Sequence, residues 1–449
     1  MKPQRLMHVA ALGAAIVFAM KPGLAGAQAS APVSAQLSTQ PAAQIAGESR
    51  GAYLARAADC IACHSTPEGK PFAGGLKMGT PLGNIFSTNI TPDTQTGIGR
   101  YSLADFDRAV RQGVAKDGHH LYPAMPYPSY ARISDADLAA LYGYFMHEVA
   151  PVRQQNRASE IRWPLNMRWP LAIWNGLFVD TQPYRTDPAH DAQWNRGAYL
   201  VQGLGHCGAC HTPRGAAFEE KTTGGDDSAF LGGATLDGWT ASDLRGDQAT
   251  GLGRWSKADI VAFLKDGGNA HASVFGSMID VYNNSSQFLT DSDRDAIATY
   301  LKSLPPGHPA QTWTYDPATA QTLKQGDLRM PGAQTFRTQC ASCHGIDGKG
   351  LGQRLPSLAG NPNVLAADPS SVVNLILNGS QRVVRHGVPD SYRMAPFRLQ
   401  LSDQEIADVT TWVRQAWGNH AGAVTPSDVA KLRASTDMSS ERVIVLKMR

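Results

Sequence analysis

The sequence predicts a mostly α-helical protein of three tandem units, in which short helices are separated by long loops. One motif, Cys-x-x-Cys-His, occurs as "DCIACH" at 59–64, "HCGACH" at 206–211 and "QCASCH" at 339–344, and these copies contain all six cysteines. The first two copies lie in longer repeats, because "RGAYLARAADCIACHSTP" at 50–67 matches "RGAYLVQGLGHCGACHTP" at 196–213 at most positions. Strand signals are sparse, and glycine and proline punctuate the loops. Repetition of this kind predicts repeated structural units.

The first residues are typical of a secretory signal peptide. Lys2 and Arg5 give a basic start, and the apolar run from Val9 to Met20 is too short to span a bilayer comfortably. Residues 25–27, "AGA", then supply the small-x-small pattern of a cleavage site. A buried N-terminal helix is the alternative. We expect residues 1–27 to be a signal peptide and the mature chain to be exported.

Each unit has the same order of parts: a helix, the cysteine motif, a long loop, a methionine and a closing helix. The closing helices carry a start signal, in which a Ser or Thr cap is followed three residues later by an acidic residue. These pairs are Ser134 and Asp137, Thr290 and Asp293, and Ser402 and Glu405.

The repeats and the composition between them predict the domain boundaries. We expect units at 48–150, 190–305 and 328–417. The other segments are a Trp/Pro-rich linker at 151–189, a second linker at 306–327 and a polar C-terminal tail at 418–449.

The cysteine motif points to covalent haem. Two thiols three residues apart can bond both vinyl groups of one haem, and the adjacent histidine then points its imidazole at the iron. Zinc is one alternative, but it needs four ligands and each motif offers three at most. A redox-active dithiol is the other, and it has no need of the histidine. We predict three haem c groups. They would be attached by Cys60, Cys63, Cys207, Cys210, Cys340 and Cys343, with His64, His211 and His344 as proximal iron ligands.

A methionine is the expected second axial ligand of each iron, because Met/His ligation raises the reduction potential and suits electron transfer. Met125, Met278 and Met394 each stand between a haem motif and a closing helix. Prolines shortly after Met125 and Met394 keep the chain extended there. Met278 lacks such a proline, and His271 or His206 could compete for its iron. A methionine that simply fills the core is the alternative at all three positions.

Other repeated or unusual residues also carry predictions. Arg100 and Arg254 occupy equal positions in "GRYS" and "GRWS", and they either pair with haem propionates or lie on the surface beside a helix start. Tyr53 and Tyr199, in the repeated "GAYL", are expected to pack on the helix before each haem. The aromatic stretch at 163–179 is either a membrane or partner surface, or packing between the first two units.

With these motifs, "FSTNITPDTQTGIGRYS", "LYPAMPYPSY" and "RWPLAIW" make the chain resemble the triheme cytochrome c subunits of bacterial membrane-associated dehydrogenases for alcohol, gluconate, fructose or aldehyde. The likeness covers nearly the whole mature chain. It implies three tandem class I cytochrome c-like haem domains in the periplasm. It also implies a partner catalytic subunit with flavin, pyrroloquinoline quinone or molybdenum, and ubiquinone or a terminal oxidase as acceptor. Peripheral association with the outer face of the cytoplasmic membrane would follow, although the polar residues 418–449 differ from the hydrophobic anchor of some members.

The expected role is electron transfer, without catalysis by this chain alone. No Ser-His-Asp order, phosphate-binding loop, dinucleotide-binding glycine pattern or carboxylate pair stands beside the haem motifs. The net charge of +3 gives no reason to expect nucleic acid as a partner. Two other functions stay open: a multihaem peroxidase or oxidase, which needs an open sixth site on one iron, and a free-standing periplasmic electron carrier.

Overall fold

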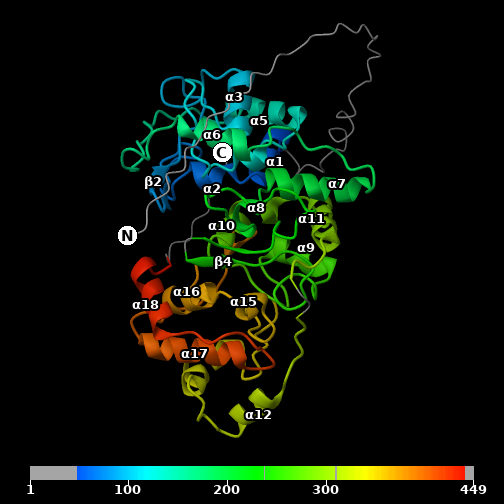
Figure 1. Ribbon diagram of the computed structural model, residues 1–449, viewed down its shortest axis with the longest axis vertical. Coiled ribbons are helices and arrows are strands. Elements are labelled where there is room, and N and C mark those ends of the chain that lie inside the picture. The colour runs from blue at the N-terminus through cyan, green and yellow to red at the C-terminus, as the bar shows by residue number, and fades with distance from the viewer. Residues whose placement is uncertain (1–47, 237, 309–310, 440–449) are drawn as a thin grey trace, which may run out of the picture.

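The computed structural model of the chain describes residues 48–236, 238–308 and 311–439. The three units follow one another along its long axis, with the first at the top of Figure 1, the second in the middle and the third at the bottom. Helices dominate, and the strands of the described part form two-stranded antiparallel hairpins, one in each unit. This agrees with the predicted fold class. The predicted signal peptide lies outside the described residues.

The first two units repeat the same order of elements. The first consists of α1 (Arg50–Ala57), α2 (Cys60–His64), β1 (Lys77–Thr80), β2 (Gly83–Phe86), α3 (Leu103–Gln112), α4 (Tyr127–Tyr130) and α5 (Asp135–His147), followed in the linker by α6 (Pro170–Phe178). The second consists of α7 (Ala192–Tyr199), η2 (Leu200–Leu204), α8 (Gly208–His211), β3 (Ala234–Leu236), β4 (Trp239–Ala241), α9 (Lys257–Asp266), α10 (Met278–Asn284), η3 (Ser286–Phe288) and α11 (Asp291–Ser303).

The third unit keeps this order with more short elements. It consists of α12 (Ala318–Lys324), α13 (Ala333–Thr335), η4 (Phe336–Cys340), α14 (Ala341–His344), α15 (Pro362–Leu365), α16 (Ser370–Asn378), β5 (Val384–Arg385), β6 (Val388–Pro389), α17 (Asp403–Gln415) and α18 (Pro426–Ser435). Every helix in the part of the chain that the structure describes is too short or too polar to cross a bilayer.

The predicted starts of the closing helices are confirmed. The hydroxyl groups of Ser134, Thr290 and Ser402 each accept the backbone N–H of the residue three positions further on. Glu405 also returns to the Ser402 N–H and so closes a full capping box at the start of α17. Such caps satisfy N–H groups that have no partner inside the helix.

The glycine of the repeated "RGAYL" lets the opening helix of a unit touch its closing helix backbone to backbone. A Cβ at Gly51 would overlap the Ala140 carbonyl oxygen on α5, and one at Gly197 would overlap the Ala296 carbonyl oxygen on α11. The arginine of the same repeat adds an ion pair across each crossing. Because the haem motif follows directly after the opening helix, this packing fixes where the motif lies.

The tyrosines of the repeat join the first unit to the second. Tyr53 donates from α1 to Asp293 at the start of α11 with an O–O distance of 2.6 Å, and Tyr199 donates from the second unit to Asp137 at the start of α5 at 2.7 Å. Each hydroxyl also accepts a backbone N–H, from Thr290 and Ser134 respectively. The exchange is reciprocal, so the two units form a pair with approximate two-fold symmetry. The sequence predicts only packing for these tyrosines.

The buried cores follow the same division. One hydrophobic core contains residues of both the first and second units, among them Tyr53, Phe72, Tyr199 and Leu204. The third unit has a core of its own around Phe336, Trp412 and Trp417. The second and third units meet through hydrogen bonds and through a small apolar cluster, in which Val383 packs against Val274, Ile279 and Tyr282. One example of the hydrogen bonds is at Ser371, whose hydroxyl accepts the Thr240 N–H at 2.7 Å and donates to the Thr240 carbonyl.

Two helices outside the predicted bounds of the third unit pack against its core. The predicted linker at 306–327 contains α12, whose Leu323 is buried in the core of the third unit. The predicted polar tail at 418–449 contains α18, which packs on α16 and α17 and buries Val429 completely. Both helices are mostly polar and contribute few apolar side chains, so composition does not reveal that they belong to the core.

Candidate haem sites

All three motif histidines are held in the same way. The Nδ1 atom of His64 lies 2.7 Å from the Thr88 carbonyl oxygen, that of His211 lies 2.7 Å from the Ser242 carbonyl oxygen, and that of His344 lies 3.1 Å from the Pro356 carbonyl oxygen. A carbonyl oxygen only accepts, so Nδ1 carries the proton and Nε2 keeps a free lone pair. Burial lowers the pKa of each imidazole, although the carbonyl acts in the opposite direction. Each ring is therefore neutral and fixed as metal-bound imidazoles are.

The cysteines are placed for covalent attachment rather than for redox chemistry. None of the six forms a disulfide. Burial raises the pKa of Cys60 and of Cys207 to about 12 and that of Cys340 to about 11. A redox-active Cys-x-x-Cys pair needs a thiol with a lowered pKa.

The donor geometry also disfavours zinc at the cysteine motifs. Over residues 48–236, 238–308 and 311–439, the group of His, Cys, Asp or Glu side chains that converges closely enough for a metal ion consists of Asp243, Asp247 and His308. It contains no cysteine, so the motifs do not gather the four ligands of a zinc site.

A cavity of about 740 Å³ lies beside the first motif. Cys60, Cys63, His64 and Met125 all line it, and its walls are mostly apolar. Its volume lies within the range of about 300–1,000 Å³ that is usual for ligand and cofactor sites. The residues present therefore fit one haem, with its attachment points and both expected axial ligands on the same cavity.

The same cavity reaches the second motif. Ala209 and Cys210, from the second unit, line it together with Cys63. Cys63 and Cys210 are close enough for their charges to interact. The first and second attachment sites thus share one cavity, between the two units that Tyr53 and Tyr199 join.

The three predicted methionine ligands differ in their surroundings. Met125 lines the first cavity, as described above. Met394 is partly buried against the core of the third unit, and its N–H donates to the Ser380 hydroxyl at 3.0 Å. Met278 begins α10 and packs with a small cluster of Val274, Ile279 and Tyr282. Ligation by Met125, Met278 and Met394 stays a prediction.

The two histidines that could compete with Met278 have other contacts. His271 stacks on Trp255, with ring centroids 5.4 Å apart, and lies 3.6 Å from the Asp259 carboxylate. His206 lines the first cavity, and its ring lies edge-on to Tyr130.

The two repeated arginines also differ. Arg100 is exposed. The guanidinium of Arg254 bonds the carbonyl oxygens of Gln248 and Gly360 and lies 4.8 Å from the ring centre of Trp313. Arg254 therefore connects the second unit to the third. Propionate contacts of Arg100 and Arg254 stay predictions.

Two buried donors that sequence reasoning missed suit a propionate or another polar group of haem. The Tyr122 hydroxyl and the Trp255 indole N–H are buried without a hydrogen-bond partner, and Tyr122 lines the first cavity. Buried polar groups of this kind are normally satisfied. Their signal in the sequence is position: Trp255 directly follows Arg254, and Tyr122 comes shortly before Met125.

The aromatic linker fits both interpretations of its sequence. On the inner side, Trp174 and Phe178 of α6 line the first cavity, and the Trp174 indole N–H donates to the Ala217 carbonyl of the second unit at 2.9 Å. On the outer side, large apolar side chains such as Trp163 and Leu177 are exposed.

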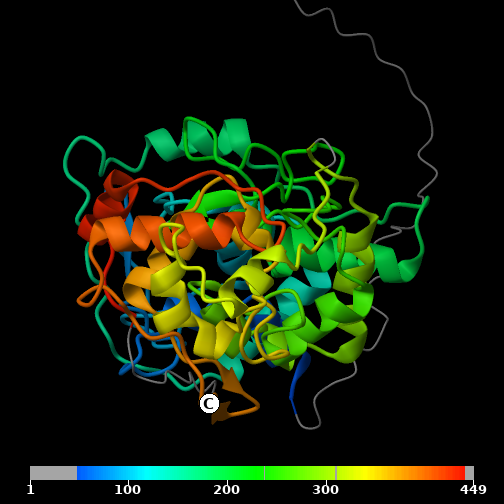
Figure 2. The same ribbon diagram turned by 90° about the horizontal axis from the view of Figure 1, so that it is seen from below.

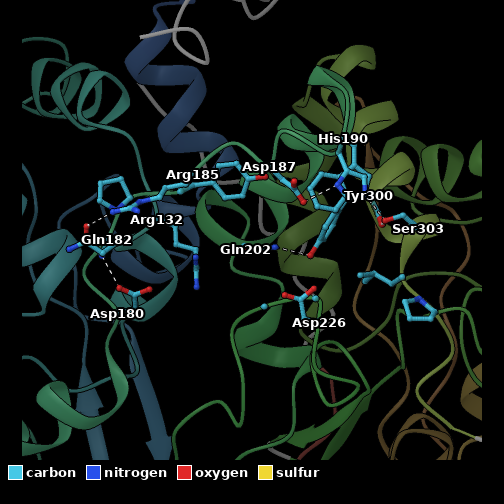
Figure 3. Close-up of a pocket in the computed structure, with 17 residues that line it drawn as sticks. Arg132, Asp180, Gln182, Arg185, Asp187, His190, Gln202, Asp226, Tyr300 and Ser303 are labelled. Atoms are coloured by element: carbon cyan, nitrogen blue, oxygen red, sulfur yellow. Dashed lines mark hydrogen bonds and ion pairs between the residues drawn. The ribbon is translucent and has the colours of Figure 1, made fainter. Parts of the chain in front are cut away.

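A second cavity, of about 690 Å³, lies between residues 180–190 of the linker and the second unit (Figure 3). None of the six cysteines lines it. Several of its polar groups already bond one another, since Gln202 donates to the Tyr300 hydroxyl at 2.7 Å and His190 lies 2.9 Å from Asp187. It is a polar junction between the linker and the second unit, separate from the candidate haem sites.

A sequence profile of the cytochrome c family matches residues 48–147, 195–305 and 330–417. The chain belongs to the cytochrome c family. The three matches coincide with the three haem motifs and their closing helices, and haem c is therefore the covalently bound cofactor of this cytochrome.

Named relatives share most of the length of the cytochrome. It is 52% identical over 391 residues to the gluconate 2-dehydrogenase cytochrome c subunit of Pantoea cypripedii, covering 86% of this chain and 89% of the relative. It is 50% identical over 405 residues to the cytochrome c subunit of a quinone alcohol dehydrogenase of Gluconacetobacter polyoxogenes, covering 88% and 86%. A diheme c-type cytochrome of Cereibacter sphaeroides is 34% identical over 305 residues, covering 66% of this chain and 98% of the relative.

Proposed function

We propose that this cytochrome is a three-haem electron-transfer subunit of a dehydrogenase complex. It takes electrons from a separate catalytic subunit and passes them through its haems to an acceptor at the membrane. The observation that carries the proposal is the threefold motif histidine with Nδ1 bonded to a backbone carbonyl, within a chain whose relatives at 50% identity or more are named as cytochrome c subunits of dehydrogenases.

The residues of each unit would hold one haem. The cysteine pairs Cys60 and Cys63, Cys207 and Cys210, and Cys340 and Cys343 would form the thioether bonds, and His64, His211 and His344 would ligate the irons. Met125, Met278 and Met394 would complete the coordination. Haem c supplies reversible one-electron chemistry when bound. The protein's part is to fix the ligand orientation, exclude water with apolar walls and hold the units at constant separation.

The partner in this proposal is a dehydrogenase catalytic subunit of the flavin, pyrroloquinoline quinone or molybdenum type. Ubiquinone or a terminal oxidase is the acceptor, and the complex lies on the periplasmic side of the cytoplasmic membrane. Support for the partner comes from the names of the relatives, and support for export comes from the predicted signal peptide at 1–27. Cys63 and Cys210 line one cavity, and this favours transfer within the pair without movement of the units.

The test is purification of the complex followed by rapid mixing with the partner's substrate. We expect the haem absorption to become reduced within the turnover time of the enzyme, and then to be reoxidised when a soluble quinone is added. If the cytochrome purifies without a dehydrogenase and no catalytic subunit encoded beside it reduces its haems, the free-standing carrier is the better description. Binding of carbon monoxide to a reduced haem, or of cyanide to an oxidised haem, would favour the peroxidase or oxidase alternative instead.

A further inference from the structure

The linker between the first two units carries an unusual apolar surface, which we call the linker face. It consists of Trp163, Leu165, Met167, Trp169, Ile173 and Leu177. Trp163 is 78% exposed and Leu177 is 71% exposed. The exposed residues 169, 173 and 177, at the N-cap of α6 and within it, are spaced by four, so they form one stripe along the helix. Single exposed apolar residues need no explanation, but a contiguous set marks an interaction site.

The opposite side of α6 is fixed firmly to the body of the protein. Asn175 accepts the Tyr127 hydroxyl at 2.8 Å and donates to the Gln112 carbonyl at 2.9 Å. Trp174 packs edge-on to Tyr127 and bonds the second unit. Figure 1 shows α6 in front of the first unit, and in Figure 2 it is the blue-green helix at the upper margin. The linker face is therefore held outward by a rigid support.

The charges in the linker that carries this face are mostly positive. Residues 151–179 contain four arginines and a single acidic residue, Glu160. Arg162 is exposed within the linker face, and Arg168 stacks on Tyr122 at 3.5 Å from the ring centre. Tryptophan, aliphatic side chains and arginine together are typical of the headgroup zone of a bilayer, where indole rings and cations lie beside anionic phosphates.

We propose that the linker face docks on the surface of a bilayer that contains anionic phospholipid. The charge complementarity and the outward stripe of tryptophan and aliphatic residues favour lipid over a protein partner. The proposal deepens the proposed function, on which it rests for the membrane acceptor. The inner side of α6 lines the first cavity, and a helix is about 10–12 Å across with its side chains. Docking therefore places the first haem site one helix thickness from the lipid surface.

The test is flotation of the complete haem-loaded cytochrome with vesicles of phosphatidylcholine, alone or with a quarter phosphatidylglycerol. We expect binding to both, with stronger binding to the anionic vesicles. The double variant Ile173→Ser/Leu177→Ser should bind at least about tenfold more weakly, because each side chain loses its burial in the lipid. Arg162→Gln should weaken binding to the anionic vesicles about fivefold and leave binding to neutral vesicles unchanged. The matched control is Met330→Ser/Leu399→Ser, which removes two exposed apolar side chains from the third unit and should bind as the wild type does.

Equal flotation of Ile173→Ser/Leu177→Ser and wild type would overturn the proposal, and so would failure of the wild type to bind either vesicle. If that variant keeps vesicle binding but no longer co-purifies with a dehydrogenase, the linker face is a protein interface and the lipid proposal is wrong. Failure of the proposed function is distinct. It would appear as haems that no dehydrogenase reduces, and it would leave the vesicle result unchanged.

Discussion

Single residues decide the chemistry of each haem site, and the axial methionine gives a direct test. We expect Met394→Ala to keep its haem attached, because the cysteines and His344 are untouched. Water or a histidine should fill the vacated position and lower the potential of that haem by on the order of 0.1 V, within the range of about 0.8 V that axial ligands span. A spectroelectrochemical titration measures this. Met330→Ala, an exposed methionine of the same unit, is the control. Overlapping titration curves for Met394→Ala and wild type would remove Met394 from the ligand set.

The buried pair of Arg196 and Asp293 predicts a pH-dependent stability. Burial opposes ionisation of Asp293, but Arg196, at 2.8 and 2.7 Å, and Tyr53 outweigh it and hold its pKa below the usual value. A lowered pKa stabilises the fold above the unfolded value of about 3.9, and this stabilisation is lost as the pH falls through the folded value. Asp293→Asn should therefore cost roughly 3 kcal/mol at pH 7 and less at pH 3.

Urea unfolding at the two pH values measures that difference. Asp295→Asn, an exposed carboxylate on the same helix, should change stability little at either pH. A cost for Asp293→Asn that is the same at pH 7 and pH 3 would show that Asp293 is not ionised in the folded protein.

Sequence reasoning at this scale succeeded where chemistry requires fixed spacing. The Cys-x-x-Cys-His motifs must keep their order along the chain, so they are visible without a structure. Tyr53 and Tyr199 were expected only to pack, because their partners Asp293 and Asp137 lie in the other unit. The partners become apparent only when the two units are placed side by side. Tyr122 and Trp255 were missed for the same reason, since burial without a partner is a property of the folded chain.

At the scale of elements, the two crossings of opening and closing helices depend on glycine. Gly197→Ala should push α7 away from α11 and destabilise the protein by about 1–3 kcal/mol. Gly143→Ala is the matched control, because Gly143 lies inside α5 with no atom within 4 Å of an added Cβ. It should stabilise the protein by about 0.4–1 kcal/mol. Thermal unfolding of both variants measures whether Gly197→Ala destabilises the protein and Gly143→Ala stabilises it. A neutral Gly197→Ala would mean that α7 and α11 can separate without cost.

The predictable elements are those with strong local signals. The closing helices were located by their caps, and the structure agrees at all three starts. The packing of α12 and α18 was not anticipated, because their sequences are polar and only one or two side chains of each enter the core. Such helices are stabilised by tertiary contact rather than by amphipathic pattern.

At the scale of the whole molecule, the cysteine inventory predicts the number of haems. Alkaline pyridine spectra of the denatured protein should count three covalently bound haems per chain, since the three motifs use all six cysteines. A count near two, or haem that solvent extracts, would show that one motif is not used.

The shared core predicts how the molecule can be divided. A chain that ends after His308 keeps both contributors to the first core and should fold with two low-spin haems and resist proteolysis. A chain that ends after Ala150 loses Tyr199 and the second unit's half of the core, and should be degraded rapidly. Limited proteolysis followed by absorption spectra compares the two. Equal resistance of both fragments would show that the first unit folds without the second.

The exchanged tyrosines have a consequence for building chimaeras among related cytochromes. Each of the first two units contains a tyrosine that donates to the aspartate at the start of the other unit's closing helix. Neither unit can therefore be exchanged by itself. If the first unit alone is replaced, its Tyr and Asp come from another protein. They must then bond native residues of the second unit, across a shared core of which only one half has changed in sequence. The smallest transferable module is the pair, and the third unit, which has a core of its own, is the part that can be exchanged separately if Val383 and its contacts with the second unit are kept.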